Sequence, residues 1–248
     1  MPPSAVLIDD WRTLRRATRP GAIRTHLAAA MREEGLVKDD ELFHDAFDYA
    51  SAFHRAMTER DLREHTVEQV LSLTMYTLGE PKPPTDPALS RATTRALERN
   101  ADQVQWYDDA VPLLEDLRGR GKPLALVANT IFGLGQPWEE RLAPYFPTRV
   151  LSREFGFVKP HPGMFLEAAR RLGANPKDCV FVGDLPLSDV WGAQQVGMRT
   201  VLVDRGDEEQ PMFRANDARL AANLGVNLAQ VRPDHTVSSL RDVAPLVD

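Results

Sequence analysis

The sequence contains almost no cysteine, no long apolar run and no excess of basic charge. Cys179 is the single cysteine among 248 residues, which excludes an intramolecular disulfide and a cysteine-based zinc cluster. No apolar run approaches the roughly 18 residues of a membrane-spanning helix. The formal net charge of −6 argues against a basic nucleic-acid-binding surface. The first residues carry no basic segment typical of a secretory signal. We therefore expect a cytoplasmic protein without nucleic-acid or membrane partners, as a monomer or homodimer.

Short apolar runs indicate buried parallel strands. Hydrophobic residues make up 43% and charged residues 27% of the chain, as in folded globular proteins. Four runs suit strands buried on both faces: 5–8, 124–127, 179–182 and 200–203. Helical patterns separate them, for example Phe165, Ala168, Ala169 and Leu172 on one face. The sequence thus predicts an α/β fold with a doubly wound, Rossmann-like parallel sheet.

Residues 16–104 differ from the rest because helical patterns follow one another without a strand between them. One apolar stripe runs through Leu42, Ala46, Tyr49, Phe53 and Met57. Two later helices begin with clear signals, a capping-box pattern at Thr66 and an Asp-Pro pair at 86–87. We therefore predict an inserted all-helical domain at 16–104, and an α/β core formed by 1–15 and 105–248.

Polar residues follow the predicted strands at their carboxyl ends, where open α/β sheets bind ligands. Asp9 follows the first run, Asn129 the second, and Asp184 the third, with Asp189 five residues later. Lys159 lies in the loop before the helix that carries Phe165. Any one of these residues, taken alone, is more often a turn or helix cap than a catalytic group. Together they place three carboxylates, an amide and a lysine at one edge of the sheet.

This combination resembles the haloacid dehalogenase superfamily, subfamily I, with a helical type C1 cap. The matching segments are Ile8-Asp-Asp-Trp-Arg-Thr-Leu14, Val127-Ala-Asn-Thr130, Val158-Lys-Pro-His-Pro162 and Val182-Gly-Asp-Leu-Pro-Leu-Ser-Asp189. The resemblance extends over nearly the whole chain. It implies a hydrolase, and most directly a Mg²⁺-dependent phosphatase that acts on a small phosphorylated metabolite.

The resemblance also implies a role for each matching residue. Asp9 would be the nucleophile that forms an aspartyl-phosphate. Mg²⁺ would be held by Asp9, the backbone carbonyl of Trp11 and Asp184, which are oxygen ligands that this ion prefers. Lys159 would neutralise the nucleophile and bind the transferring group, and Asp189 would fix Lys159 or a metal-bound water. The further residues expected to bind substrate are Asn129, Thr130 and Arg12.

Two positions depart from the pattern of the family's phosphatases. Trp11 stands where a second Asp usually protonates the leaving oxygen and later activates water, and an indole can do neither. General acid–base groups contribute about 10² to 10⁴ in rate, so alkyl phosphates should react slowly. Ala128 stands where a hydroxyl usually binds the phosphoryl group, unless Asn129 or Thr130 substitutes. Arg12, where a small residue is usual, could supply a cation, although a solvent-facing side chain is favoured in so arginine-rich a chain.

Two other functions stay open at this point. A 2-haloacid dehalogenase is one, because members with that activity also carry an aromatic residue two positions after the nucleophile. They need no metal, however, and lack the acidic pattern of Asp184 and Asp189. The other is a catalytically impaired binding protein of the same fold, which Trp11 and Ala128 favour. Three mutually repelling carboxylates favour retained chemistry.

Overall fold

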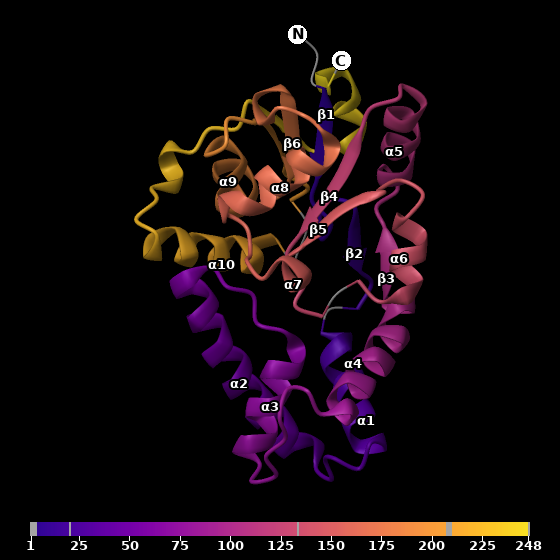
Figure 1. Ribbon diagram of the computed structural model, residues 1–248, viewed down its shortest axis with the longest axis vertical. Coiled ribbons are helices and arrows are strands. Elements are labelled where there is room, and N and C mark those ends of the chain that lie inside the picture. The colour runs from indigo at the N-terminus through magenta and orange to yellow at the C-terminus, as the bar shows by residue number, and fades with distance from the viewer. Residues whose placement is uncertain (1–3, 20, 133, 207–209, 248) are drawn as a thin grey trace. The chain divides into compact units, whose positions relative to one another are not determined.

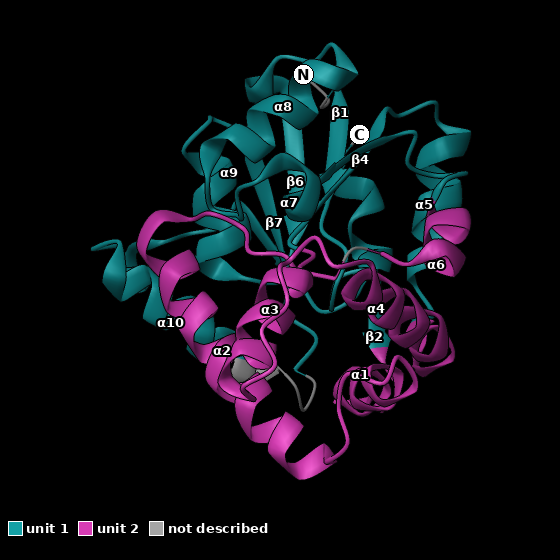
Figure 2. Cartoon of the chain, turned by 60° about the horizontal axis from the view of Figure 1, so that its bottom comes forward, with its two compact units in different colours: residues 1–16, 106–129, 143–248 teal, residues 17–105, 130–142 magenta. Residues whose placement is uncertain are grey.

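The chain forms two compact units in a computed structural model that describes residues 4–19, 21–132, 134–206 and 210–247. The first unit contains residues 1–16, 106–129 and 143–248, and the second contains residues 17–105 and 130–142 (Figure 2). The chain passes between them through β2 (Arg15–Ala17) and β3 (Val104–Trp106), which pair in a two-stranded sheet. The architecture is α/β with an inserted helical unit, as the sequence predicts.

The first unit is built on a six-stranded parallel sheet. Its strands are β1 (Ala5–Ile8), β4 (Leu124–Ala128), β5 (Thr148–Leu151), β6 (Cys179–Gly183), β7 (Arg199–Val203) and β8 (His235–Val237). Their order is β5-β4-β1-β6-β7-β8. β1 pairs with both β4 and β6, and these three strands are labelled in Figure 1. All residues of β1, β4 and β6 are buried, which is why these strands read as continuous apolar runs. The four predicted strands are confirmed. β5 and β8 were not predicted from the sequence, because neither contains a continuous apolar run.

Helices cover both faces of this sheet. They are α5 (Ala110–Gly119), α7 (Ser152–Phe155), α8 (Pro162–Leu172) and α9 (Gly192–Gln194). A further helix, α10 (Gln210–Asn223), packs against the segment Pro186–Trp191 that follows β6. The predicted apolar face of α8 packs through Phe165, Ala168 and Ala169 against the strand residues Leu7 and Val127 in one buried cluster. In Figure 1, α5 lies on the other side of the sheet. The carboxyl ends of β1, β4 and β6 are thereby left for the loops that carry the candidate site.

The second unit is helical. It contains α1 (Ala22–Glu33), α2 (Asp40–Asp61), α3 (Val67–Thr77), α4 (Pro87–Asn100) and α6 (Gln136–Leu142). The predicted capping signals operate as expected. The Gln69 side chain accepts from the backbone N–H of Thr66 at 2.8 Å, and Asp86 accepts from the N–H of Ala88 at 2.9 Å. The core of this unit includes Leu27, Phe43, Leu71 and Leu89.

Two features of the helical unit differ from the sequence-based expectation. The stripe expected on α2 is largely on the solvent side, because Leu42, Tyr49 and Phe53 are 59%, 60% and 48% exposed. Of the predicted stripe Ala46 is buried, and the buried face of α2 also carries Phe43 and Ala50, which the stripe does not include. Residues 130–142 also cluster with the helical unit, although the sequence groups them with the α/β core. The apolar periodicity of the sequence does not show which face of α2 is buried, because that depends on the helices that α2 packs against.

None of the described helices combines the length and the apolar composition that a membrane span requires.

Candidate active site

Asp9, Lys159 and Asp189 form a buried ion-pair cluster at the carboxyl end of the sheet. Lys159 Nζ lies 2.5 Å from Asp9 Oδ1 and 2.7 Å from Asp189 Oδ1. The three residues are at most 6% exposed. Asp9 follows β1 directly, and its N–H donates to the carbonyl of Val182 in β6. The second oxygen of Asp9, Oδ2, accepts from the hydroxyl of Thr13 at 3.2 Å. The structure thus brings together three of the residues that the sequence singled out.

Backbone contacts hold Asp189 in this cluster. Its Oδ2 accepts from the N–H of Leu185 at 2.9 Å, and the residue belongs to a short π-helix at Pro186–Trp191. Asp217 of α10 caps that helix, accepting from the N–H groups of Leu187 and Ser188 and from the Ser188 hydroxyl. Asp217 is 3% exposed and carried no motif by which the sequence could have revealed it.

One lysine is shared between two carboxylates, and burial together with these charges changes the pKa values of Asp9 and Lys159. Burial raises the pKa of Asp9 to about 7, with the charge of Asp189 adding to the effect and that of Lys159 opposing it. Burial alone would lower the pKa of Lys159, but Asp189 and Asp9 outweigh it and raise that pKa. The neighbouring carboxylates therefore favour the protonated form of the lysine, whereas the pKa of Asp9 is raised toward neutrality.

Asp184 lies beside this cluster and is paired with Arg12. Arg12 Nε donates to Asp184 Oδ2 at 3.0 Å, and both side chains are at most 3% exposed. The prediction that Arg12 faces the solvent is therefore wrong. Its guanidinium points into the protein because it pairs with a buried carboxylate. Burial, followed by the charges of Asp189 and Asp9, raises the pKa of Asp184 despite this arginine.

Asn129 contacts the lysine loop. Its Oδ1 accepts from the N–H of Lys159 at 2.8 Å, and its Nδ2 donates to the Lys159 carbonyl at 3.4 Å. The amide expected to bind substrate thus also holds Lys159 in place. Thr130 begins the segment that clusters with the helical unit. Ala128, at the end of β4, is buried and offers no hydroxyl.

The turn after Asp9 carries Trp11 and a second ion pair. Trp11 is half-buried and bridges to Arg15, whose guanidinium lies 6.0 Å from the indole ring. Arg15 donates to both carboxylate oxygens of Asp10 in a buried pair. This Asp10–Arg15 pair was not foreseen, because nothing local distinguishes it from two surface charges.

The carboxylates fit a hard divalent cation. One oxygen from each of Asp9, Asp184 and Asp189 lies within 4.8 Å of the others, and this is the one such group of three among the described residues. Buried carboxylate oxygens suit Mg²⁺. This group differs from the metal ligands expected from the sequence in one member: it contains Asp189, and the expected set contains the Trp11 carbonyl. Asp189 Oδ1 already accepts a hydrogen bond from Lys159.

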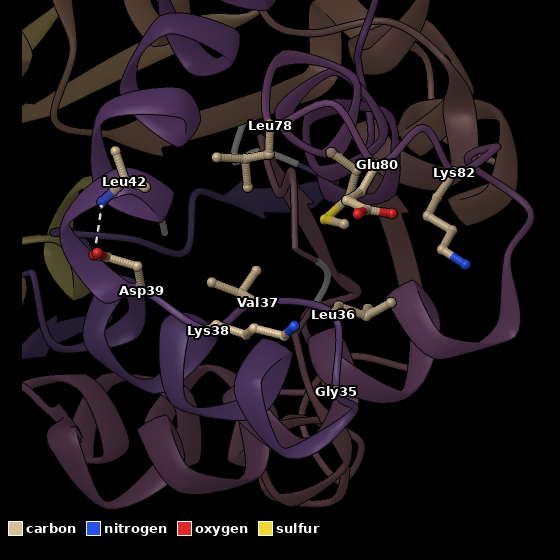
Figure 3. Close-up of a pocket in the computed structure, with 10 residues that line it drawn as sticks. Gly35, Leu36, Val37, Lys38, Asp39, Leu42, Leu78, Glu80 and Lys82 are labelled. Carbon is tan, nitrogen blue, oxygen red and sulfur yellow. Dashed lines mark hydrogen bonds between the residues drawn. The ribbon is translucent and has the colours of Figure 1, made fainter.

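The helical unit has a separate hollow of about 360 Å³ at the start of α2 (Figure 3). Apolar side chains such as Val37 and Leu78 line it together with the charged Lys38 and Lys82. Asp39 accepts from the N–H of Leu42 at 3.1 Å and so caps α2 at its edge. Nothing like the Asp9 cluster occurs there among the described residues.

A comparison with known protein families shows which family the chain belongs to. The model described as haloacid dehalogenase-like hydrolase matches residues 10–197, which is more than half of the chain. The chain belongs to this family. A second model, HAD-hydrolase-like, matches residues 157–243. The helical insertion after β1 agrees with the type C1 cap of this haloacid dehalogenase-like chain.

Several curated relatives are named as phosphatases. The chain is 40% identical over 116 residues to a glyceraldehyde 3-phosphate phosphatase of Methanopyrus kandleri, a match that covers 45% of the chain and 48% of the relative. It is 34% identical over 143 residues to a phosphoserine phosphatase of Thermus thermophilus, covering 54% and 56%. A ribulose-1,5-bisphosphate 5-phosphatase of Halopiger xanaduensis is 30% identical over 171 residues, covering 68% and 66%. The chain thus spans about half to two thirds of the length of these relatives.

Solved structures share the fold along the whole chain. A 2-haloacid dehalogenase from Pseudomonas syringae pv. Tomato superposes with a TM-score of 0.66 at 22% identity, covering 98% of this chain and 97% of that one. The HAD-hydrolase YfnB from Bacillus subtilis, bound to magnesium, gives a TM-score of 0.62 at 16% identity with both chains fully covered. At these identities the likeness concerns the fold.

Proposed function

We propose that the chain is a Mg²⁺-dependent phosphatase that hydrolyses monoesters of small phosphorylated metabolites through an aspartyl-phosphate. The observation that carries the proposal is the buried Lys159, shared between Asp9 and Asp189 with Asp184 alongside. A lysine fixed in this way offers a permanent cation to the oxygens of a phosphoryl group, next to a carboxylate that can attack phosphorus.

Asp9 is the proposed nucleophile. One of its oxygens attacks phosphorus, the bond from phosphorus to the ester oxygen breaks, and the leaving group departs as an oxyanion that takes a proton from solvent water. Water then cleaves the aspartyl-phosphate, which releases phosphate and restores Asp9. In the structure Lys159 and Thr13 each bind one oxygen of Asp9, so the carboxylate is held in a single orientation before substrate arrives.

Asp9, Asp184 and the Trp11 carbonyl are the proposed Mg²⁺ ligands. When bound, the ion would neutralise charge on the phosphoryl oxygens during transfer. Lys159 supplies a second positive charge, and Asp189 and Asn129 keep that lysine in position.

We also propose that none of the described residues serves as a general acid for the leaving group. Trp11 occupies the position where the family's phosphatases carry the acid, and its indole cannot donate a proton of suitable pKa. Asp10, the nearest carboxylate in sequence, is held at both oxygens by Arg15 and so cannot substitute. Phosphates with good leaving groups, such as aryl phosphate esters and acyl phosphate anhydrides, are therefore the preferred substrates of the proposed enzyme.

The names of the relatives support phosphorylated metabolites as substrates, since the three described above are phosphatases of a sugar phosphate, an amino-acid phosphate and a sugar bisphosphate. We also propose that residues 16–104 act as a cap that excludes water from the site. Hydrogen exchange with and without a phosphate analogue tests this part: distinct protection changes near residue 15 and residues 100–108 are expected, and uniform slowing contradicts a moving cap.

A substrate panel tests the activity. The purified chain is assayed against aryl, acyl and alkyl phosphates and against 2-haloacids, each with Mg²⁺ and with a chelator. We expect phosphate release that requires Mg²⁺ and is lost in Asp9→Asn. Asp178→Asn is the matched control, because it makes the same chemical change at an exposed aspartate of the same unit.

The panel also separates the alternatives. Halide release without metal would establish the dehalogenase instead. Absence of any turnover, with Mg²⁺ still bound, would establish an impaired member that acts by binding.

A further inference from the structure

Arg12 adopts a backbone conformation that is costly for its type. Its φ is +69°, and Arg12 and Leu62 are the two non-glycine residues with positive φ among those described. The turn is closed by hydrogen bonds from the N–H of Arg12 to the Arg15 carbonyl, at 2.7 Å, and from the N–H of Leu14 to the Asp10 carbonyl, at 2.8 Å. A side chain other than glycine persists in this region only where other contacts compensate for the strain.

Contacts of the guanidinium supply that compensation. Arg12 Nε binds Asp184 Oδ2 at 3.0 Å, away from solvent. The ring of Phe213, on α10, lies 5.3 Å from the guanidinium carbon, within cation–π range. A carboxylate directly after β6 and an aromatic ring from α10 therefore hold one buried cation in the turn after the proposed nucleophile.

The carboxylate that Arg12 binds is the one proposed to ligate Mg²⁺. A guanidinium on a carboxylate oxygen draws electron density from it, and a fixed positive charge at this place repels a divalent cation. When all three carboxylates are ionised, as metal binding requires, they carry −3. Lys159 and Arg12 then bring the site to −1 without a metal, against −2 if Arg12 were neutral.

We propose that Arg12 is a built-in counter-cation of Asp184 that competes with Mg²⁺ for this carboxylate, and that Phe213 holds it there. This inference rests on the metal site of the proposed function. It makes Arg12 a residue that sets metal affinity, and it gives α10 a part in that affinity through Phe213.

Calorimetric titration of the metal-free chain with MgCl₂ tests the proposal. In Arg12→Gly, which removes the cation and the backbone strain together, we expect Mg²⁺ to bind at least about tenfold more tightly than in the parent. Arg12→Gln removes the charge but keeps a long side chain, and should shift affinity in the same direction. Arg12→Lys keeps a charge and should stay near the parent. Phe213→Leu, which frees the guanidinium, should give a smaller tightening.

Arg118→Ala is the matched control, since it removes an exposed arginine charge from the same unit. Its Mg²⁺ affinity should equal that of the parent. A thermal shift on adding MgCl₂, larger in Arg12→Gly than in the parent, gives a second readout independent of turnover.

The outcomes separate this inference from the proposed function. Equal or weaker Mg²⁺ binding in both Arg12→Gly and Arg12→Gln, beside normal binding in the parent, overturns the competition while the metal site stands. If Arg12→Gly does not fold, Arg12→Gln alone decides by the same criterion. Absence of Mg²⁺ binding in every variant overturns the metal site, and this inference with it.

Discussion

Gly183, the last residue of β6, has no room for a side chain, and replacing it with alanine should damage both stability and the site. A Cβ at this position would lie 2.4 Å from Asp189 Oδ2, 2.5 Å from its Cγ and 2.7 Å from its Cβ. Carbon and oxygen atoms in contact need about 3.5 Å, so the Asp189 side chain must move by about 1 Å.

That movement breaks contacts that hold the cluster. Asp189 binds Lys159 Nζ at 2.7 Å and the Leu185 N–H at 2.9 Å, and neither bond survives a shift of this size at full strength. Overpacking costs about 1 to 3 kcal/mol, and a weakened charge-assisted hydrogen bond adds about 1.5 to 3 kcal/mol. Gly183→Ala should therefore lower the free energy of unfolding by about 2.5 to 6 kcal/mol.

Urea unfolding followed by circular dichroism measures this loss, and the phosphatase assay measures its effect on the site. Gly119→Ala is the control, because Gly119 ends α5 with no atom within 4 Å of the added Cβ and without positive φ. Alanine there should be neutral or stabilising by up to about 1 kcal/mol. A Gly183→Ala protein as stable as the parent, or equal losses in both variants, would refute the reasoning.

Three further outcomes are expected. Trp11→Asp should raise turnover of alkyl phosphates relative to aryl phosphates, by part of the roughly 10² to 10⁴ that a general acid supplies; an unchanged ratio in a folded variant contradicts the account of Trp11. Because the folded pKa of Asp9, about 7, lies above its ordinary value of 3.8, its stabilising contribution is present at low pH and lost as pH rises to 7. Without metal, the stability of the parent relative to Asp9→Asn should thus fall by about 2 to 3 kcal/mol between pH 5 and 8, measured in urea, and a pH-independent difference counts against the raised pKa. Asp217→Ala leaves buried N–H groups of Leu187 and Ser188 without their acceptor and should cost about 2 to 4 kcal/mol, whereas a change below about 0.5 kcal/mol, typical of a surface site, would show that this cap is dispensable.

The sequence by itself determined the elements whose signal is local. A strand buried on both faces must be apolar throughout, and this requirement alone located β1, β4, β6 and β7. Helix starts at Thr66 and Asp86 were equally readable, because a capping side chain binds backbone groups within three residues of itself. The placement of Asp9 and Asp184 after buried strands followed from the geometry of parallel sheets, whose carboxyl ends meet at one edge.

Only the tertiary structure decided which charges meet. Arg12 and Asp184 are 172 residues apart, and a buried carboxylate rather than any local pattern turns this arginine inward. The same holds for Asp217, which caps a helix 29 residues before it. The exposed face of α2 and the grouping of residues 130–142 with the helical unit likewise depend on which surfaces pack together. Apolar periodicity shows that a segment has a face to bury, but the partner of a buried charge is set by packing between distant parts of the chain.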